Sequence, residues 1–203
     1  MASRRVQSVN AKENLFERGF KTWCENTSET LRRKCGKRTY EPLDPWELAK
    51  ELKVEVWDIR KIQGLSKDAL NHLTSAQGDE WSAVTVYIGK RLIVVLNPRH
   101  SPARQASNLM HELAHVIRGH APSSMVHSET GFIMRTFDEK QEAEAEWLSG
   151  SLLLPRAALT YCQTRNVPSD AILDSYQVSQ QMLRYRQGVT GITRQFSRYR
   201  SVS

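Results

Sequence analysis

The chain has 203 residues, with 29 lysines and arginines against 22 aspartates and glutamates, and hence a formal net charge of +7. Its content of 39% hydrophobic and 25% charged residues is typical of a globular protein with one full domain and an arm, or with two small lobes. The longest aliphatic run, residues 92–96, is far shorter than the roughly 20 residues that cross a bilayer. No continuous apolar signal segment is visible near the N-terminus, and we expect a cytoplasmic protein without a membrane span.

The three cysteines argue against a disulfide framework and a four-thiolate zinc site. Cys24, Cys35 and Cys162 are odd in number and form no CxxC pair, so we expect reduced thiols. The positive net charge permits weak attraction to nucleic acid or to acidic partners, but it identifies no partner.

The first third of the chain predicts helices and one strand. Apolar residues recur at helical spacing over about residues 10–35, and Gly36 ends this pattern. Asp44-Pro45 is an N-cap followed by a proline at the first helical position, which begins a short amphipathic helix. Residues 54–59 predict a strand, and residues 66–74 predict another short helix.

A hairpin is predicted in the middle of the chain. The β-rich runs Ala83–Ile88 and Arg91–Leu96 are joined by Gly89-Lys90, a two-residue turn with glycine.

The rest of the chain predicts mainly helices. Ser101-Pro102 opens a long helix through Arg118, which Gly119 ends, and a polar stretch follows over residues 120–138. Further helices are expected over about residues 139–153, 155–165, 175–186 and 193–200. The order of elements indicates an α+β fold, in which a small antiparallel sheet with the hairpin packs on the long helix and a helical C-terminal part follows.

The motif His111-Glu112-Leu113-Ala114-His115 on the long helix carries the strongest chemical signal. Histidines four residues apart are separated by only about 40° around a helix axis, so both imidazoles can bind one metal ion. Glu112 would lie beside that ion and suits a general base. The alternative is a surface helix with two solvated histidines, but the apolar residues around the motif indicate a buried helix and favour the metal.

A catalytic zinc site usually needs a third protein ligand. His120 lies about 180° around the helix from His111, and we expect it at the helix end or behind a ligand. Glu142 on the next helix is the better donor, and Glu146, one turn on, could accept the free ring N–H of a liganding histidine. Glu144 lies about 200° from Glu142, so we expect it to face solvent. An exposed acidic face without a metal is the alternative for this helix.

Taken together, these motifs resemble the ImmA/IrrE family of HExxH peptidases. The resemblance covers about residues 43–190 and rests on four segments, which are Leu43–Ala49, Arg104 with the HExxH helix, Glu142–Pro155, and Tyr176–Ser179 with the following Tyr185-Arg186. Glu142 stands at the third-ligand position of the family, whereas Glu146 stands where the family usually has Asn or Asp.

The resemblance implies a gluzincin-like zinc endopeptidase with one zinc ion per chain. It also implies a protein substrate, a helix–turn–helix repressor cleaved in mobile-element induction or in the DNA-damage response. On this interpretation residues 1–42 are an N-terminal helix or arm, residues 43–165 the metallopeptidase core, and residues 166–203 a helical segment with a basic tail.

Zinc held by His111, His115 and Glu142 would acidify its water, and Glu112 would take the proton. Either strand of the hairpin could align a substrate by strand addition. The donor that stabilises the oxyanion is open, and the candidates are Tyr161, His127 and Tyr176.

Two hypotheses from other classes compete with the peptidase. A DNA-binding regulator is one, because arginines alternate with aromatic residues near the C-terminus, at Arg184, Arg186, Arg194, Arg198 and Arg200. A solvated basic helix is the simpler interpretation of this pattern, since no base-reading motif is recognisable. The other is a metal-bound but catalytically silent interaction module, against which the intact Glu112 argues.

Overall fold

The structure is a computed structural model that describes residues 16–62, 66–75, 81–88, 91–121, 124–127, 133–136 and 138–200. The helices are α2 (Phe20–Lys34), α3 (Pro45–Glu51), α4 (Lys67–Thr74), α5 (Pro102–Arg118), α6 (Glu139–Leu153), α7 (Arg156–Thr164), α8 (Ser169–Tyr176), α9 (Gln180–Thr190) and α10 (Ile192–Arg200). The strands are β1 (Val54–Asp58), β2 (Ala83–Ile88), β3 (Arg91–Leu96), β4 (Ser124–His127) and β5 (Ile133–Thr136). The predicted α+β class is confirmed.

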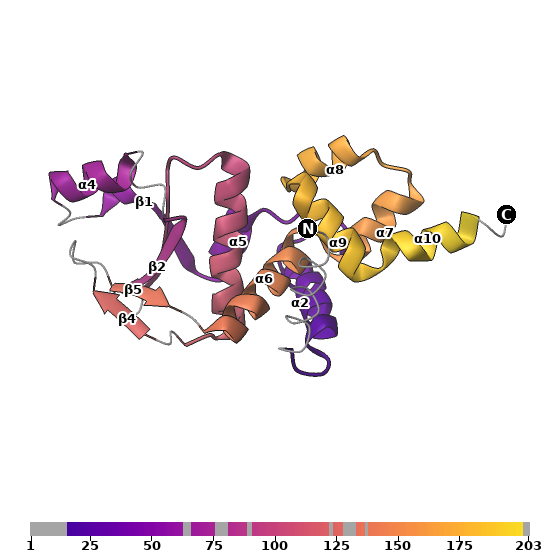
Figure 1. The fold of residues 1–203 in the computed structure, drawn as a ribbon, viewed down its shortest axis with the longest axis horizontal. Helices are drawn as coiled ribbons and strands as arrows, with labels where there is room; N and C mark the ends of the chain where they lie inside the picture. Colours follow the sequence, from indigo (N-terminus) through magenta and orange to yellow (C-terminus); the bar gives the residue numbers. More distant parts are fainter. Residues whose placement is uncertain are drawn as a thin grey trace, which may run out of the picture.

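The elements form three groups along the long axis of the molecule. Figure 1 shows the strands and α4 at one end, α5 and α6 in the middle, and α7 to α10 at the other end. Helix α5 contacts the sheet, and α6 packs against α5 on one side and α2 on another. The described helices include none with the length and apolarity that a bilayer crossing requires.

The three-stranded sheet is mixed. Its order is β1-β3-β2, with β2 antiparallel to β3 in the predicted hairpin and β1 parallel to β3. We predicted a purely antiparallel sheet, and the difference arises from β1. Because α4 and β2 lie between β1 and β3 in the chain, the connection has the length that a parallel return requires.

Strand β3 is the centre of the sheet and is covered on both faces. Val94 and Leu96 belong to the main core with α5, whereas Ile93 and Val95 form a smaller cluster with Ile59. Leu70 and Leu73 of α4 pack against that smaller cluster. This arrangement explains the continuous apolar run of β3, because a strand buried on both sides has no polar alternation.

Capping residues mark both ends of α5 and the start of α6, the two helices that frame the candidate site. The Ser101 side chain accepts a hydrogen bond from a backbone N–H in the first turn of α5, and Gly119 ends this helix with φ of 68°. Asp138 and Gln141 form a capping box at the start of α6. The site therefore lies on rigid elements with defined ends.

Two buried arginines hold the C-terminal end of α6. Arg32 of α2 donates to the carbonyl of Leu152, and Arg186 of α9 donates to the carbonyl of Leu154. These carbonyls have no partner within the helix, so the two guanidinium groups satisfy them. Burial lowers the pKa of Arg32 to about 10.

Some element boundaries differ from the prediction. The first described helix begins at Phe20, and the earlier part of the predicted helix, residues 10–15, lies outside the described residues. The polar stretch after α5 contains the paired strands β4 and β5. The helix predicted over residues 175–186 is wrong, because α8 ends at Tyr176 and a turn precedes α9, whose N-cap is Ser179.

Candidate metal centre

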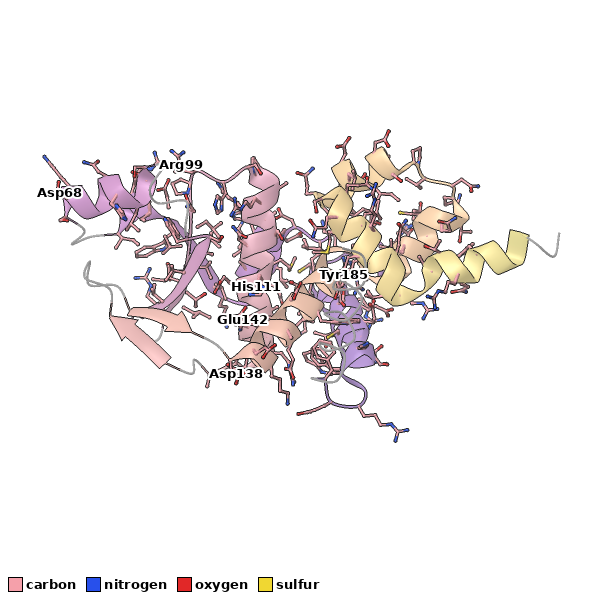
Figure 2. The ribbon with its side chains drawn as sticks, viewed as in Figure 1. Asp68, Arg99, His111, Asp138, Glu142 and Tyr185 are labelled. Atoms are coloured by element: carbon pink, nitrogen blue, oxygen red, sulfur yellow. The ribbon has the colours of Figure 1, made fainter. Side chains whose placement is uncertain are left out.

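Three side chains from α5 and α6 converge at one point. His111 Nε2 lies 3.1 Å from His115 Nε2 and 3.2 Å from Glu142 Oε2, and His115 Nε2 lies 3.5 Å from Glu142 Oε1. Figure 2 shows His111 and Glu142 facing one another where the two helices cross. Within the described residues, these are the side chains grouped closely enough to hold a metal ion.

The spacing of the donor atoms fits a tetrahedral ion. Ligands at about 2.05 Å from a zinc ion in tetrahedral geometry lie about 3.3 Å from one another. The two histidine nitrogens lie 3.1 Å apart, and they lie 3.2 Å and 3.5 Å from the Oε2 and Oε1 atoms of Glu142, respectively, which is close to this value. His111, His115 and Glu142 could therefore hold one ion and leave a fourth position for water.

Electrostatics around the site differ from one ligand to the next. Burial, together with the neighbouring His111, lowers the pKa of His115, which favours the neutral imidazole that a metal needs. Burial alone would lower the pKa of His111 too, but the nearby carboxylates of Glu142, Glu112 and Glu146 outweigh it and raise that pKa. The hydrogen bond with His111 lowers the pKa of Glu142.

Glu112, the predicted base, is tied to the sheet. The hydroxyl of Thr85 on β2 donates a hydrogen bond to Glu112 Oε2 at 2.5 Å. Thr85 is 6% exposed, so its side chain points into the interface between sheet and helix. We did not predict this residue. Its one signal in the sequence is a hydroxyl in the middle of an apolar strand.

A buried series of hydrogen-bonded side chains extends from the Nδ1 side of the His115 ring. His120 Nδ1 lies 2.9 Å from His115 Nδ1, and His120 Nε2 lies 3.2 Å from Glu144 Oε2. Arg118 Nε donates to the same carboxylate oxygen at 2.6 Å. The prediction that Glu144 faces solvent is therefore wrong, since it is 2% exposed.

The charge of Glu144 is maintained by its partners. Burial alone would raise the pKa of Glu144, but the hydrogen bonds from Arg118 and His120 outweigh this effect and lower it. The guanidinium of Arg118 also lies 5.3 Å from the ring of Phe20 and 5.1 Å from the ring of Trp23, both on α2.

The role predicted for Glu146, as the acceptor of a histidine ring N–H, stays a prediction. Glu146 is exposed on α6 one turn after Glu142, and its charge contributes to the raised pKa of His111. The carboxylate that stands behind the histidine ligands is that of Glu144, which reaches His115 through His120.

The tyrosines proposed as oxyanion donors lie elsewhere. Tyr176 is buried in the C-terminal helices, where its hydroxyl donates to the carbonyl of Tyr40, and the prediction is wrong for this residue. Tyr161 stacks on the ring of Tyr40 at 4.0 Å. Helix α7, which carries Tyr161, lies on the far side of α6 from the sheet (Figure 1). The backbone of His127 belongs to β4, and its side chain lies outside the described residues.

The C-terminal arginines separate into different environments. Arg186 is fully buried and donates to Leu154 and to Glu25, so the prediction that it contacts nucleic acid is wrong. Arg184 and Arg194 are exposed. The side chains of Arg198 and Arg200 lie outside the described residues.

An α+β fold with an HExxH helix and a glutamate from the next helix is the arrangement of an HExxH metallopeptidase. Residues 63–187 match the family model Peptidase_M78, described as the IrrE N-terminal-like domain. This match covers more than half of the chain, and the chain belongs to this family. The resemblance to the ImmA/IrrE peptidases is thus confirmed. No curated protein and no solved structure matches the chain.

Proposed function

We propose that this protein is a zinc-dependent endopeptidase whose active site is centred on His111, His115 and Glu142. The observation that carries the proposal is the convergence of these three donor atoms from α5 and α6 beside Glu112. Two imidazoles and one carboxylate are a ligand set that zinc uses in peptidases, with water or substrate at the fourth position.

His111, His115 and Glu142 would hold the zinc, which would supply a water of lowered pKa and polarise the scissile carbonyl. Glu112 would accept the proton of that water and return it to the leaving amine. The hydrogen bond from Thr85 holds the Glu112 carboxylate in one orientation. Because the carboxylate is already oriented, the entropic part of the activation barrier is lower.

The sheet provides one strand for a substrate. Strand β3 lies in the centre, so of the two hairpin strands only β2 lies at an edge of the three-stranded sheet. An extended peptide that pairs with β2 would pass the position of Thr85, and hence of Glu112. Strand β5 contacts β2 without pairing with it, so a peptide that pairs with β2 would have to displace β5 from this edge.

The proposed substrate is a helix–turn–helix transcriptional repressor, cleaved in mobile-element induction or a DNA-damage response. This part of the proposal is supported by the family to which the chain belongs. The edge strand favours a protein segment that can be presented in extended form.

The test combines zinc analysis with cleavage of a purified helix–turn–helix repressor. We expect one zinc ion per wild-type chain and specific cleavage of the repressor. Glu112→Gln should keep the zinc and lose about 10²- to 10⁴-fold in rate, which is the usual contribution of a general base. Glu139→Gln, at an exposed glutamate in the first turn of α6, is the matched control and should retain the wild-type rate.

Two results would contradict the proposal. Undiminished cleavage by Glu112→Gln would exclude Glu112 as the base. A zinc-loaded wild-type chain that binds the repressor but leaves it intact would favour the silent interaction module.

A further inference from the structure

The polar chain behind His115 is continuous from the metal centre to a buried ion pair. It runs from His115 Nδ1 to His120 Nδ1 over 2.9 Å, and from His120 Nε2 to Glu144 Oε2 over 3.2 Å. Arg118 closes it with a hydrogen bond of 2.6 Å to Glu144. The side chains of His115, His120 and Glu144 are 4%, 7% and 3% exposed, so water competes little for these contacts.

With an ion on His115 Nε2, hydrogen-bond chemistry assigns a position to each proton from His115 to Glu144. His115 faces His111 and Glu142 with Nε2, so a metal at that point leaves the proton of its ring on Nδ1. That N–H can donate only if His120 Nδ1 accepts, and a neutral His120 then carries its own proton on Nε2. This second N–H points at the Glu144 carboxylate, which accepts from Arg118 as well. With an ion on His115 Nε2 and His120 neutral, this set of tautomers satisfies the three contacts given above.

The opposite tautomer of His115 would break this pattern. With its proton on Nε2, His115 would present an N–H to the ion and an unprotonated Nδ1 to His120. Partners that fix the tautomer and ring orientation of a ligand increase its affinity for the metal. A neutral His120 held by Glu144 therefore favours the His115 tautomer that binds a metal.

We propose that His120 and Glu144 are positioning residues that hold His115 in its metal-binding tautomer and orientation. The proposal uses the metal centre of the proposed function but does not require peptidase activity. It differs from the role we predicted for Glu146, because the acid acts through an intervening histidine from the end of α5.

Zinc affinity and imidazole NMR test this proposal in the full chain. His120→Phe keeps an aromatic ring but removes the acceptor, and we expect zinc to bind about 10- to 100-fold more weakly in competition with a chelating dye. His120→Gln restores an acceptor in the amide oxygen and should recover most of the affinity. Glu144→Gln keeps an acceptor without the charge, and its affinity should fall between those of the wild type and His120→Phe.

A buried histidine outside the site provides the matched control. His100 precedes α5, is 6% exposed, lies 3.0 Å from Asn108, and is not one of the residues of the candidate metal centre. His100→Phe should cost folding stability without weakening zinc, which separates general damage to a buried site from loss of positioning.

The ¹⁵N shifts of His115 in the zinc-free wild type give a second measurement, which applies even if His120→Phe does not fold. We expect the proton of the His115 ring on Nδ1. A proton on Nε2, or wild-type zinc affinity in both His120→Phe and Glu144→Gln, would overturn the proposal. A wild-type chain that takes up no zinc would instead remove the proposed function, and the positioning role with it.

Discussion

Thr85 on the edge strand β2 donates a hydrogen bond to Glu112, the proposed general base. Removing the Thr85 hydroxyl alone tests whether this hydrogen bond matters for the reaction. Thr85→Val keeps the shape but removes the donor to Glu112. A hydrogen bond to a charged group contributes about 1.5–3 kcal/mol, and each 1.4 kcal/mol of lost orientation costs about tenfold in rate. We expect kcat to fall roughly tenfold with zinc content unchanged, as measured on a fluorogenic peptide.

The conservative variant makes this prediction specific. Thr85→Ser retains the hydroxyl and should recover most of the rate. If Thr85→Val cleaves as fast as the wild type, the hydrogen bond to Glu112 has no part in catalysis.

Glu142 is the proposed ligand from α6, and it faces the two proposed histidine ligands on α5. Removing a partner that merely orients a metal ligand costs about 10- to 100-fold in affinity, so losing a ligand should cost more than about 100-fold. We expect Glu142→Gln to purify with little zinc by elemental analysis, whereas Glu139→Gln keeps one ion per chain. Equal zinc content in the two variants would mean that Glu142 is not a ligand.

The sequence alone was sufficient to predict His111, His115 and Glu142 as a group, because helical spacing places them on facing surfaces. It was insufficient for Glu144, because the helical-wheel argument assumes a helix with one buried face. In α6 almost every residue from Ala143 to Leu153 is buried, since α5 and α2 cover different sides. A residue 200° from Glu142 therefore meets protein rather than water.

At the scale of elements, α6 depends on the two arginines that satisfy its last carbonyls. Arg186→Met would leave the Leu154 carbonyl unsatisfied and Glu25 without its buried partner. Breaking such a pair costs about 3–5 kcal/mol when fully buried, and we expect about 3 kcal/mol here because Glu25 is partly exposed. Urea unfolding of the purified variant measures this loss.

Arg184 supplies the control on the same helix. Its side chain is exposed, so Arg184→Met should change the free energy of unfolding by no more than about 0.5 kcal/mol. Equal losses in the two variants would show that burial of Arg186 contributes nothing. The same Arg184 variant also serves the DNA-binding hypothesis, which stays a prediction for Arg184 and Arg194.

The sequence predicts those helices and strands whose ends are marked by capping or turn residues. It does not predict pairings that depend on contacts between residues far apart in the chain. Helices α5 and α6 and the β2–β3 hairpin follow from caps, turn residues and periodicity. The parallel pairing of β1 with β3 depends on a partner far along the chain, which no local pattern encodes. The domain boundaries after residues 42 and 165 stay predictions.

For the whole molecule, a bound ion should act as a cross-link between α5 and α6. A ligand at 100 times its Kd stabilises the folded state by about 2.7 kcal/mol, which corresponds to roughly 5–10 °C in Tm for a chain of this size. We expect a chelator to lower the Tm of the wild type by this amount, as measured by calorimetry. Glu142→Gln should melt at the same temperature with and without the chelator.

Acid should also destabilise the metal-free chain, in a window set by Glu144. The folded-state pKa of Glu144 is lowered from its ordinary 4.5, so its contribution to stability is present above about pH 4.5. That contribution is lost as the pH falls through the lower folded-state pKa. Unfolding curves from pH 6 to pH 3 should therefore be flatter for Glu144→Gln than for the wild type, and parallel curves would contradict this assignment.

Arg118 is stacked on Phe20 and Trp23 of α2 while it neutralises Glu144. Trp23 is 36% exposed, so the outer side of this stack is within reach of another molecule. Any molecule that displaces Arg118 from the stack acts on the same guanidinium that balances the buried acid. Thermodynamic reciprocity then requires two equal effects: the factor by which such a molecule changes the affinity for the ion is the factor by which the ion changes the affinity for that molecule.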